Sequence, residues 1–236
     1  MNSSDLEKCS EPFLHWLGEW KRGLASRPID EVVAEPARTA VASVDMIVGF
    51  CSEGPLASSR VAGIVAPVAK LFENMHASGV KHFLLFQDTH EEDAPEFESF
   101  GSHCVAGSKE SETVPELSKL PFSDLFTIIP KNSLSAALGT ILDEWLASHR
   151  DVGQFIVVGD CTDLCVYQLA MHLKLSANAS NIKRSVIVPA DCVDTYDMPV
   201  DRAEGLGILP HDGELLHHLF LYHMALNGID VIATIR

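Results

Sequence analysis

Basic residues are scarce in this sequence: 17 Lys and Arg stand against 33 Asp and Glu, giving a formal net charge of -16. Because this charge repels phosphate backbones and anionic lipids, we expect no nucleic acid partner and no membrane partner. No apolar run approaches the length of a membrane-spanning helix, and the polar start MNSSDLEKCSEPF contains no basic region followed by an apolar core. These absences favour a cytoplasmic protein.

Cysteine is too sparse for a secreted domain held together by disulfides. Six cysteines are scattered along the chain: Cys9, Cys51, Cys104, Cys161, Cys165 and Cys192. We therefore expect reduced thiols. Cys161 and Cys165 stand in a spacing that matches no common zinc signature, so a structural metal at this pair has little support.

The 236 residues, of which 47% are hydrophobic, suffice for one full core. We expect an N-terminal helical extension at residues 1–36 and a single domain at residues 37–236. Residues 12–24 predict an amphipathic helix for core packing or an oligomer contact, because apolar side chains recur there at helical spacing: Phe13, Trp16, Leu17 and Trp20. We expect a homo-oligomer.

Strand-like and helix-like segments alternate along the rest of the chain. Apolar runs predict strands at 39–50, 81–87, 126–129, 155–158, 185–190 and 230–234, and periodic segments predict helices at 61–79, 134–149, 199–209 and 214–227. Strands that alternate with helices pair in parallel and carry helices on both faces. The predicted fold class is α/β, a three-layer α/β/α sandwich with a mainly parallel sheet.

The stretch FIVVGDCTDLCVYQLA, at residues 155–170, indicates a buried strand, a turn at Gly159 and a helix with Thr162 or Asp163 as its N-cap. This places Cys165 in the first turn of a helix. The helix dipole and the free N–H groups there favour a thiolate and offer donors to an oxyanion. The alternative is that Cys165 is a small buried apolar residue.

Two further polar residues are predicted to lie at the carboxyl ends of strands. Asp45 is the lone charge in the run at 39–50, and Lys131 follows Pro130 after another strand. A carboxylate can take the proton of a thiol, while a nearby ammonium group stabilises the thiolate. The ordinary alternatives are a turn residue for Asp45 and a solvated loop lysine for Lys131.

A cluster of potential metal ligands follows the second predicted strand, in the order Asp88, His90, Glu96 and His103. One carboxylate and two imidazoles, with a further possible oxygen ligand, suit zinc, iron or manganese with water completing the coordination. The alternative is a solvated acidic loop. We expect a divalent metal cofactor, with zinc ahead of iron or manganese.

Taken together, four segments in order resemble the isochorismatase-like cysteine hydrolases, and the nicotinamidases within them. These segments are VDMIVGFC, DTHEEDAPEFESFGSHCVAGS, IPKNSLSAALGT and VVGDCTDLCV. The resemblance implies Cys165 as the nucleophile, Asp45 as its general base and Lys131 as the third member of a catalytic triad. It implies hydrolysis of a small amide, nicotinamide to nicotinate and ammonia, through a thioester.

The same resemblance implies how a substrate would be held. Asp88, His90 and His103, with Glu96 where some members have a further ligand, would bind the metal that orients the pyridine nitrogen, and Phe50 and Phe100 would flank the ring. A cis peptide bond before Cys161 would let the N–H groups of Cys161 and Cys165 form an oxyanion hole.

Several positions depart from the family pattern. Val48 stands where many members have Asn, Asp160 where an apolar residue is common, Phe100 where several nicotinamidases have Trp, and Gly101 and Ser102 where Pro-Pro is frequent. Two alternatives therefore stay open: a hydrolase of a carbamoyl, ureido or other small amide, and a non-catalytic scaffold that associates through its aromatic N-terminal helix.

Overall fold

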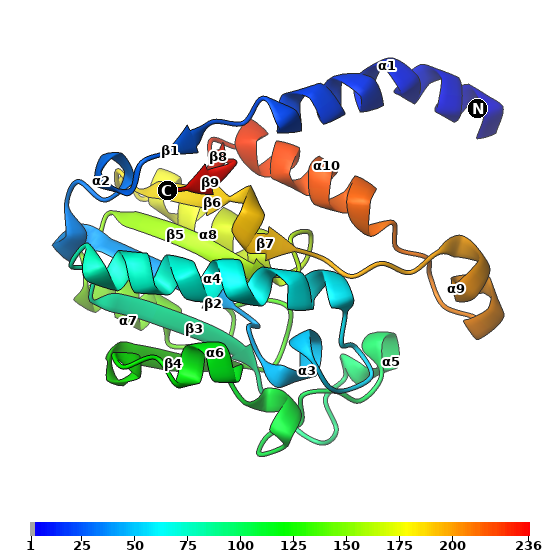
Figure 1. Cartoon of the computed structure of the whole chain (residues 1–236). Helices are drawn as coiled ribbons and strands as arrows, with labels where there is room; N and C mark the ends of the chain where they lie inside the picture. Colours follow the sequence, from blue (N-terminus) through cyan, green and yellow to red (C-terminus); the bar gives the residue numbers. More distant parts are fainter. Residues whose placement is uncertain (1–2) are drawn as a thin grey trace.

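A central parallel sheet organises the computed structural model, which describes residues 3–236 (Figure 1). The strand order is β4-β3-β2-β5-β6-β8, and β7 pairs with the end of β5. Every pairing in this sheet is parallel. The strands are β2 (Thr39–Val44), β3 (His82–Asp88), β4 (Phe126–Lys131), β5 (Gln154–Asp160), β6 (Ser185–Pro189), β7 (Val193–Asp194) and β8 (Asp230–Ile232).

Helices cover both faces of the sheet, which confirms the predicted three-layer α/β/α sandwich. Figure 1 shows α4 across the front of the sheet and α8 behind it. The long helices are α4 (Ser59–Ala77), α8 (Cys165–Ala179) and α10 (Gly213–Leu226), and α7 (Leu142–Ser148) lies on the same side as α8. Each face therefore has its own hydrophobic core.

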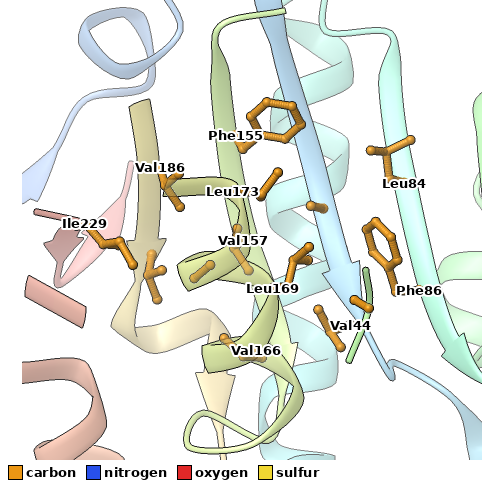
Figure 2. Close-up of a cluster of buried hydrophobic side chains, with 14 of the residues drawn as sticks. Val44, Leu84, Phe86, Phe155, Val157, Val166, Leu169, Leu173, Val186 and Ile229 are labelled. Carbon is orange, nitrogen blue, oxygen red and sulfur yellow. The ribbon is translucent and has the colours of Figure 1, made fainter. Parts of the chain in front are cut away.

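Side chains alternate between these two cores along each strand, as the pleat of a β-strand requires. In β5, Phe155 and Val157 enter the core beneath α8, whereas Ile156 and Val158 enter the core beneath α4. Figure 2 shows the first core, with Leu169 of α8 among the strand side chains. Because both faces are covered, the strands are continuous apolar runs in the sequence. Burial of each large apolar side chain contributes about 1.5–3 kcal/mol to the stability of the fold.

The N-terminal helix α1 (Ser3–Arg22) lies beside α10, and β1 (Ser26–Arg27) pairs in parallel with β9 (Thr234–Ile235). The two ends of the described chain are thus joined. The division of the chain at residue 36 remains a prediction. The structure describes no helix that is long and apolar enough to cross a bilayer.

Short helices fill the connections: α2 (Ile29–Val32), α3 (Val48–Cys51), α5 (Phe97–Phe100), α6 (Pro115–Ser118), α9 (Val200–Leu206) and the 3-10 turns η1 (Pro36–Arg38), η2 (Lys109–Ser111), η3 (Ser123–Leu125) and η4 (Ala190–Cys192). α3 and α5 lie near the carboxyl ends of the strands (Figure 1). They therefore border the edge of the sheet where the candidate site lies.

Several predicted elements have different bounds in the structure: the helix expected at 12–24 spans Ser3–Arg22, for example, and the one expected at 199–209 spans Val200–Leu206. Three of the differences have a clear local cause. The strand expected at 39–50 ends at Val44, because Asp45 has a φ of 54° and the chain then turns into α3. The helix expected at 134–149 is helical only in α7, because Ser133, Ser135 and Thr140 accept bonds from nearby backbone N–H groups and favour turns before it.

The third is the helix expected to be capped by Thr162 or Asp163. It begins at Cys165, with Leu164 as the N-cap residue and no side-chain cap. Both polar side chains are buried and bonded elsewhere, Thr162 to His217 and Asp163 to His211. Their tertiary partners therefore outcompete the local capping bond.

Candidate active site

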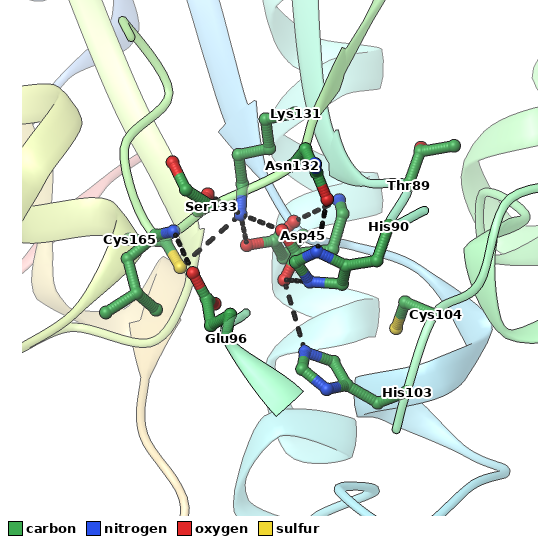
Figure 3. Close-up of polar contacts among 12 residues, drawn as sticks. Asp45, Thr89, His90, Glu96, His103, Cys104, Lys131, Asn132, Ser133 and Cys165 are labelled. Carbon is green, nitrogen blue, oxygen red and sulfur yellow. Dashed lines mark hydrogen bonds and ion pairs between the residues drawn. The ribbon is translucent and has the colours of Figure 1, made fainter. Parts of the chain in front are cut away.

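Four polar residues at the ends of different elements meet at the carboxyl edge of the sheet, and Figure 3 labels three of them, Asp45, Lys131 and Cys165. Asp45 follows β2 directly, Asp88 ends β3, Lys131 ends β4, and Cys165 begins the helix after β5. Asp88 and Lys131 are register partners in adjacent strands. Parallel pairing thus gathers residues that are distant in sequence, as the sequence analysis expected.

Lys131 is the centre of this group. Its Nζ lies 2.8 Å from Asp45 Oδ2, forms an ion pair with Asp88 Oδ1 and approaches Cys165 Sγ to 3.5 Å (Figure 3). It also donates to the Ser133 carbonyl at 3.2 Å. One ligand atom from each of Asp45, Asp88 and Cys165 lies within 4.8 Å of the others. The structure therefore brings the three residues predicted as a catalytic triad into one cluster.

Asp45 has the properties of a proton acceptor. Its Oδ1 accepts the backbone N–H of Asp88 at 2.8 Å, which fixes the carboxylate. Burial, followed by the negative charge of Asp88, raises the pKa of Asp45 to about 6 despite the opposing ion pair with Lys131. A carboxyl group with this pKa can both take and return a proton near neutral pH.

Cys165 is held as a thiol. Burial raises its pKa well above the ordinary value, and the nearby Lys131 ammonium only partly offsets this effect. Asp45 and Asp88 raise it further. Burial therefore opposes the thiolate that the helix N-terminus would favour, and the thiolate at this position stays a prediction. The proton must leave as the sulfur reacts.

The turn before Cys165 presents two free backbone donors. The Asp160–Cys161 peptide bond is cis, as the resemblance implied. The N–H groups of Leu164 and Val166 both donate to the Cys161 carbonyl. Within residues 3–236, the N–H groups of Cys161 and Cys165 have no hydrogen-bond acceptor. Two donors beside a nucleophile are the components of an oxyanion hole.

Gly159 sets the path of this turn. Its φ is 110°, and a Cβ at this position would lie 2.0 Å from the carbonyl oxygen of Val44 in the neighbouring strand. Only glycine tolerates both the conformation and the close approach. The glycine that ends the apolar run is therefore required by the geometry of the site.

The predicted metal ligands form a second cluster beside the first. His90 Nε2 lies 3.5 Å and His103 Nε2 3.8 Å from Asp88 Oδ2, and a Glu96 carboxylate oxygen lies within 4.8 Å of these ligand atoms. His90 Nδ1 contacts Asn132 Oδ1 at 3.0 Å, and His103 Nδ1 contacts the Gly101 carbonyl at 2.8 Å. These contacts orient both Nε2 atoms toward Asp88, and Figure 3 shows the two histidines.

This cluster fits a divalent metal. Two ligands about 2.1 Å from a tetrahedral zinc ion are separated by about 3.4 Å, close to the observed spacing of the imidazoles from Asp88. His90 Nε2 and Glu96 Oε1 are buried without a hydrogen-bond partner. Burial would raise the pKa of Asp88, but Lys131, His103 and His90 together hold it well below its usual range. An anionic carboxylate and unpaired donor atoms therefore converge on one point.

The two predicted substrate-binding aromatic residues flank His103. The ring centroids of Phe50 and Phe100 lie 5.7 and 6.4 Å from that of His103. The sequence analysis missed Phe97, whose ring lies 5.3 Å from His90, and Asn132, which orients His90. Asn132 directly follows Lys131, and its position beside the end of a predicted strand could have indicated that it belongs to the site.

Asp160, which departs from the family pattern, is buried and its Oδ2 has no hydrogen-bond partner. Burial, then the charge of Asp45, raises its pKa well above the ordinary value. Burial therefore favours the neutral form of Asp160, which adds no second charge beside the thiol. Val48, another departure, is buried in α3.

Comparisons with known proteins show what the chain is similar to. The Isochorismatase domain matches residues 39–232 of the chain. Nicotinamidase 1 from Arabidopsis thaliana is 28% identical, and the match covers 88% of this chain and 92% of that protein.

Similar solved structures share the fold. A cysteine hydrolase from Pseudomonas syringae has a TM-score of 0.67 at 23% identity, with 90% of this chain and 92% of that chain covered. A zinc complex of Pyrococcus horikoshii pyrazinamidase has a TM-score of 0.65 at 20% identity, and the match covers 83% of this chain and 98% of that chain. N-carbamoylsarcosine amidase from Thermoplasma acidophilum has a TM-score of 0.60 at 24% identity, and the match covers 83% of this chain and 95% of that chain.

Proposed function

The chain belongs to the isochorismatase family of hydrolases, and from this premise we propose that it hydrolyses nicotinamide to nicotinate and ammonia. The observation that carries the proposal is the buried contact of one ammonium group, Lys131 Nζ, with both the Asp45 carboxylate and the Cys165 thiol. A base, a nucleophile and a fixed counter-charge are the elements of thiol-based acyl transfer.

In the first half-reaction, Asp45 takes the proton of Cys165 as the sulfur attacks the carboxamide carbon. The substrate oxygen becomes negative and is bound by the N–H groups of Cys161 and Cys165. Asp45 then gives its proton to the departing nitrogen, which leaves as ammonia, and a thioester remains. Lys131 keeps a positive charge beside the sulfur throughout, since its neighbours raise its pKa despite burial.

In the second half-reaction, Asp45 takes a proton from water, whose oxygen attacks the thioester carbon. The C–S bond breaks, the acid is released, and the proton returns to Cys165. Asp88, His90, Glu96 and His103 would hold the divalent metal, with zinc as our first assignment. When bound, the metal would supply a Lewis acid for a ring nitrogen, and Phe50 and Phe100 would flank the ring.

Substrate choice is supported by the similarity to Nicotinamidase 1 and by the fit of the metal cluster. The second candidate substrate class is a carbamoyl or ureido compound, which the similarity to N-carbamoylsarcosine amidase favours. The aromatic flanks Phe50 and Phe100 support the pyridine amide, because a flat ring stacks between aromatic side chains.

The deciding experiment is ammonia release by purified protein from nicotinamide, pyrazinamide and small ureido compounds, with and without a chelator. We expect chelator-sensitive release from the two ring amides. Cys165→Ala should lower kcat/KM by about 10⁴-fold or more, whereas Cys9→Ala, an exposed cysteine, should leave it unchanged. Chelator-resistant turnover of ureido compounds alone would favour the second candidate, and no turnover of any amide would favour a scaffold.

We further propose that the protein acts in the cytoplasm, in recycling the pyridine ring of NAD, and that it is a homo-oligomer. The oligomer is supported by exposed apolar side chains on α1, namely Phe13, Leu14 and Trp16. Light scattering of the purified protein would measure its mass, and a monomer at all concentrations would refute this part.

A further inference from the structure

A hollow lies at the end of the sheet opposite Cys165. It has a volume of about 720 Å³ and lies between α7, the turn that leads into β5, the last part of α8 and the segment before β6. A smaller hollow of about 200 Å³ shares Arg38, Gly153 and Lys183 with it. Neither is lined by a residue of the triad or the metal cluster. We call the larger one the basic hollow.

Positive charge gathers around the basic hollow although the chain as a whole is acidic. Its lining includes four of the 17 basic residues, and one carboxylate, Asp143. The four are Arg38, Arg150, Lys183 and Arg184. Asp143 already contacts His172 at 3.0 Å. The local charge is therefore opposite in sign to the net charge of -16.

Within the described chain, three of these cations form no ion pair, although the charge of Asp143 acts on Arg184. Among residues 3–236, neither Arg150, Lys183 nor Arg184 forms an ion pair with a carboxylate. Arg38 pairs with Glu35 at 3.3 Å, but both of these side chains are exposed. Since surface ion pairs of that kind contribute little, Arg38 can turn to an incoming anion at little cost.

Arg184 is fixed in position before any ligand arrives. Its Nη1 donates to the Leu173 carbonyl at 3.0 Å and to Ser176 Oγ at 3.1 Å, and its guanidinium lies 5.5 Å from the ring centroid of Phe155. Its Nη2 has no acceptor within the described part of the chain, and its buried Nε is also unpaired. A planar cation held on one side with donors still free is preorganised for a phosphate group.

The lining also has an apolar part. Leu146, Val152 and Ile182 contribute side chains to the same hollow. A volume of 720 Å³ falls within the range of small-molecule sites, which combine apolar walls with a few placed polar groups. A bare inorganic anion would leave the apolar wall unused, whereas a phosphorylated organic molecule would use both parts.

We propose that the basic hollow binds a phosphorylated small molecule of about nucleotide size. Arg150, Lys183 and Arg184 hold its phosphate, and the organic part lies against Leu146, Val152 and Ile182. This site is separate from the catalytic one, and the proposal does not depend on the proposed hydrolysis of nicotinamide.

Isothermal titration of the full chain with ADP tests this inference. We expect saturable binding, and a dissociation constant about tenfold or more higher in Arg150→Gln/Lys183→Gln, because two charge-assisted contacts are lost. Both side chains are exposed, so this variant should fold normally, and circular dichroism checks that it does. Lys119→Gln, which removes an exposed charge beyond α6, is the matched control and should bind as the parent does.

Inorganic phosphate is the second probe. Binding of ADP at least about tenfold tighter than phosphate supports contacts to the organic part, and equal binding overturns that part of the proposal. Absence of ADP binding at about 1 mM overturns the whole. If the parent protein does not bind ADP and is a dimer that dissociates in Arg150→Gln/Lys183→Gln, the surface would instead be a contact with a second copy of the chain. Cys165→Ala should bind ADP normally, so a failure here is distinct from a failure of the proposed hydrolysis.

Discussion

At the scale of single residues, the central feature is one buried ammonium group between two carboxylates and a thiol. Lys131 is almost inaccessible to solvent, and so are Asp45 and Asp88. Charges in such a place are tolerated only because they neutralise each other. Lys131 therefore maintains the fold and the proposed chemistry at once.

Replacing Lys131 tests this dual role. We expect Lys131→Met to destabilise the protein by about 3–5 kcal/mol, because two buried carboxylates lose their counter-ion, and to abolish ammonia release. Denaturant unfolding and the amide assay measure the two effects. Lys119→Met, at an exposed lysine, is the control and should change neither quantity. A Lys131→Met protein as stable as the parent would contradict the prediction.

Three of the site residues could be predicted from sequence because they lie where strands end. Asp45, Asp88 and Lys131 are polar residues at the ends of apolar runs, and a parallel sheet brings such positions together. Phe97 and Asn132 could not be predicted by this reasoning, because their contacts with His90 depend on how the loop after β3 folds back.

At the scale of elements, the nucleophile turn is tied to the segment that carries α9. His211 Nε2 contacts Asp163 Oδ2 at 2.7 Å, and His211 Nδ1 contacts the Tyr196 carbonyl at 3.0 Å. The rings of Tyr196 and His211 stack with centroids 3.8 Å apart, and the backbones of Met198 and His211 pair. This pair therefore links two chain segments that meet behind Cys165.

The same pair makes stability depend on pH. Burial lowers the pKa of His211, but the hydrogen bond to Asp163 outweighs burial and raises this pKa above 6.5. Burial raises the pKa of Asp163, but the contact with His211 outweighs burial and brings this pKa below 3.8. The His211 contribution is complete below pH 6.5 and is lost as pH rises through the folded pKa. The contribution of Asp163 to stability is present above pH 3.8 and is lost as the pH falls through its folded pKa.

We therefore expect His211→Gln to lose about 1–3 kcal/mol of stability at pH 5.5 and less at pH 9. Denaturant unfolding of parent and variant at both pH values measures the difference. His15→Gln, at an exposed histidine of α1, should unfold like the parent at both pH values. An equal loss from His211→Gln at both pH values would mean that charge plays no part in the contact.

At the scale of the whole molecule, the two ends of the chain pack against each other. Phe13, Trp16 and Trp20 of α1 surround Tyr222 of α10, with ring centroids 5.4, 5.4 and 5.8 Å from the tyrosine ring. Trp20 also packs against the core beneath α8. The N-terminal helix therefore stabilises the last helix without touching the catalytic edge of the sheet.

Two tryptophans of α1 allow a matched test. We expect Trp20→Ala to cost about 2–4 kcal/mol and Trp16→Ala less than about 1 kcal/mol, because Trp16 is 46% exposed. Thermal and denaturant unfolding measure both. The kcat/KM for amide hydrolysis should be unchanged in each variant, and a loss of activity without a loss of stability would refute the purely structural role.

The sequence sufficed for the order of strands and helices, because burial of parallel strands on both faces leaves long apolar runs such as that of β2. It did not suffice for β1 and β7. Each consists of two residues, and each is a strand only because a distant partner, β9 or β5, lies beside it.

The two oxygens of Asp88 face in opposite directions, one to Lys131 and the other to the histidines. A redesign toward metal-free substrates could delete both imidazoles, yet it would have to keep an anion at position 88, or the lysine would lose half of its electrostatic support. The metal cluster and the catalytic cluster thus share one side chain, and Asp88 cannot be changed for the sake of one without affecting the other.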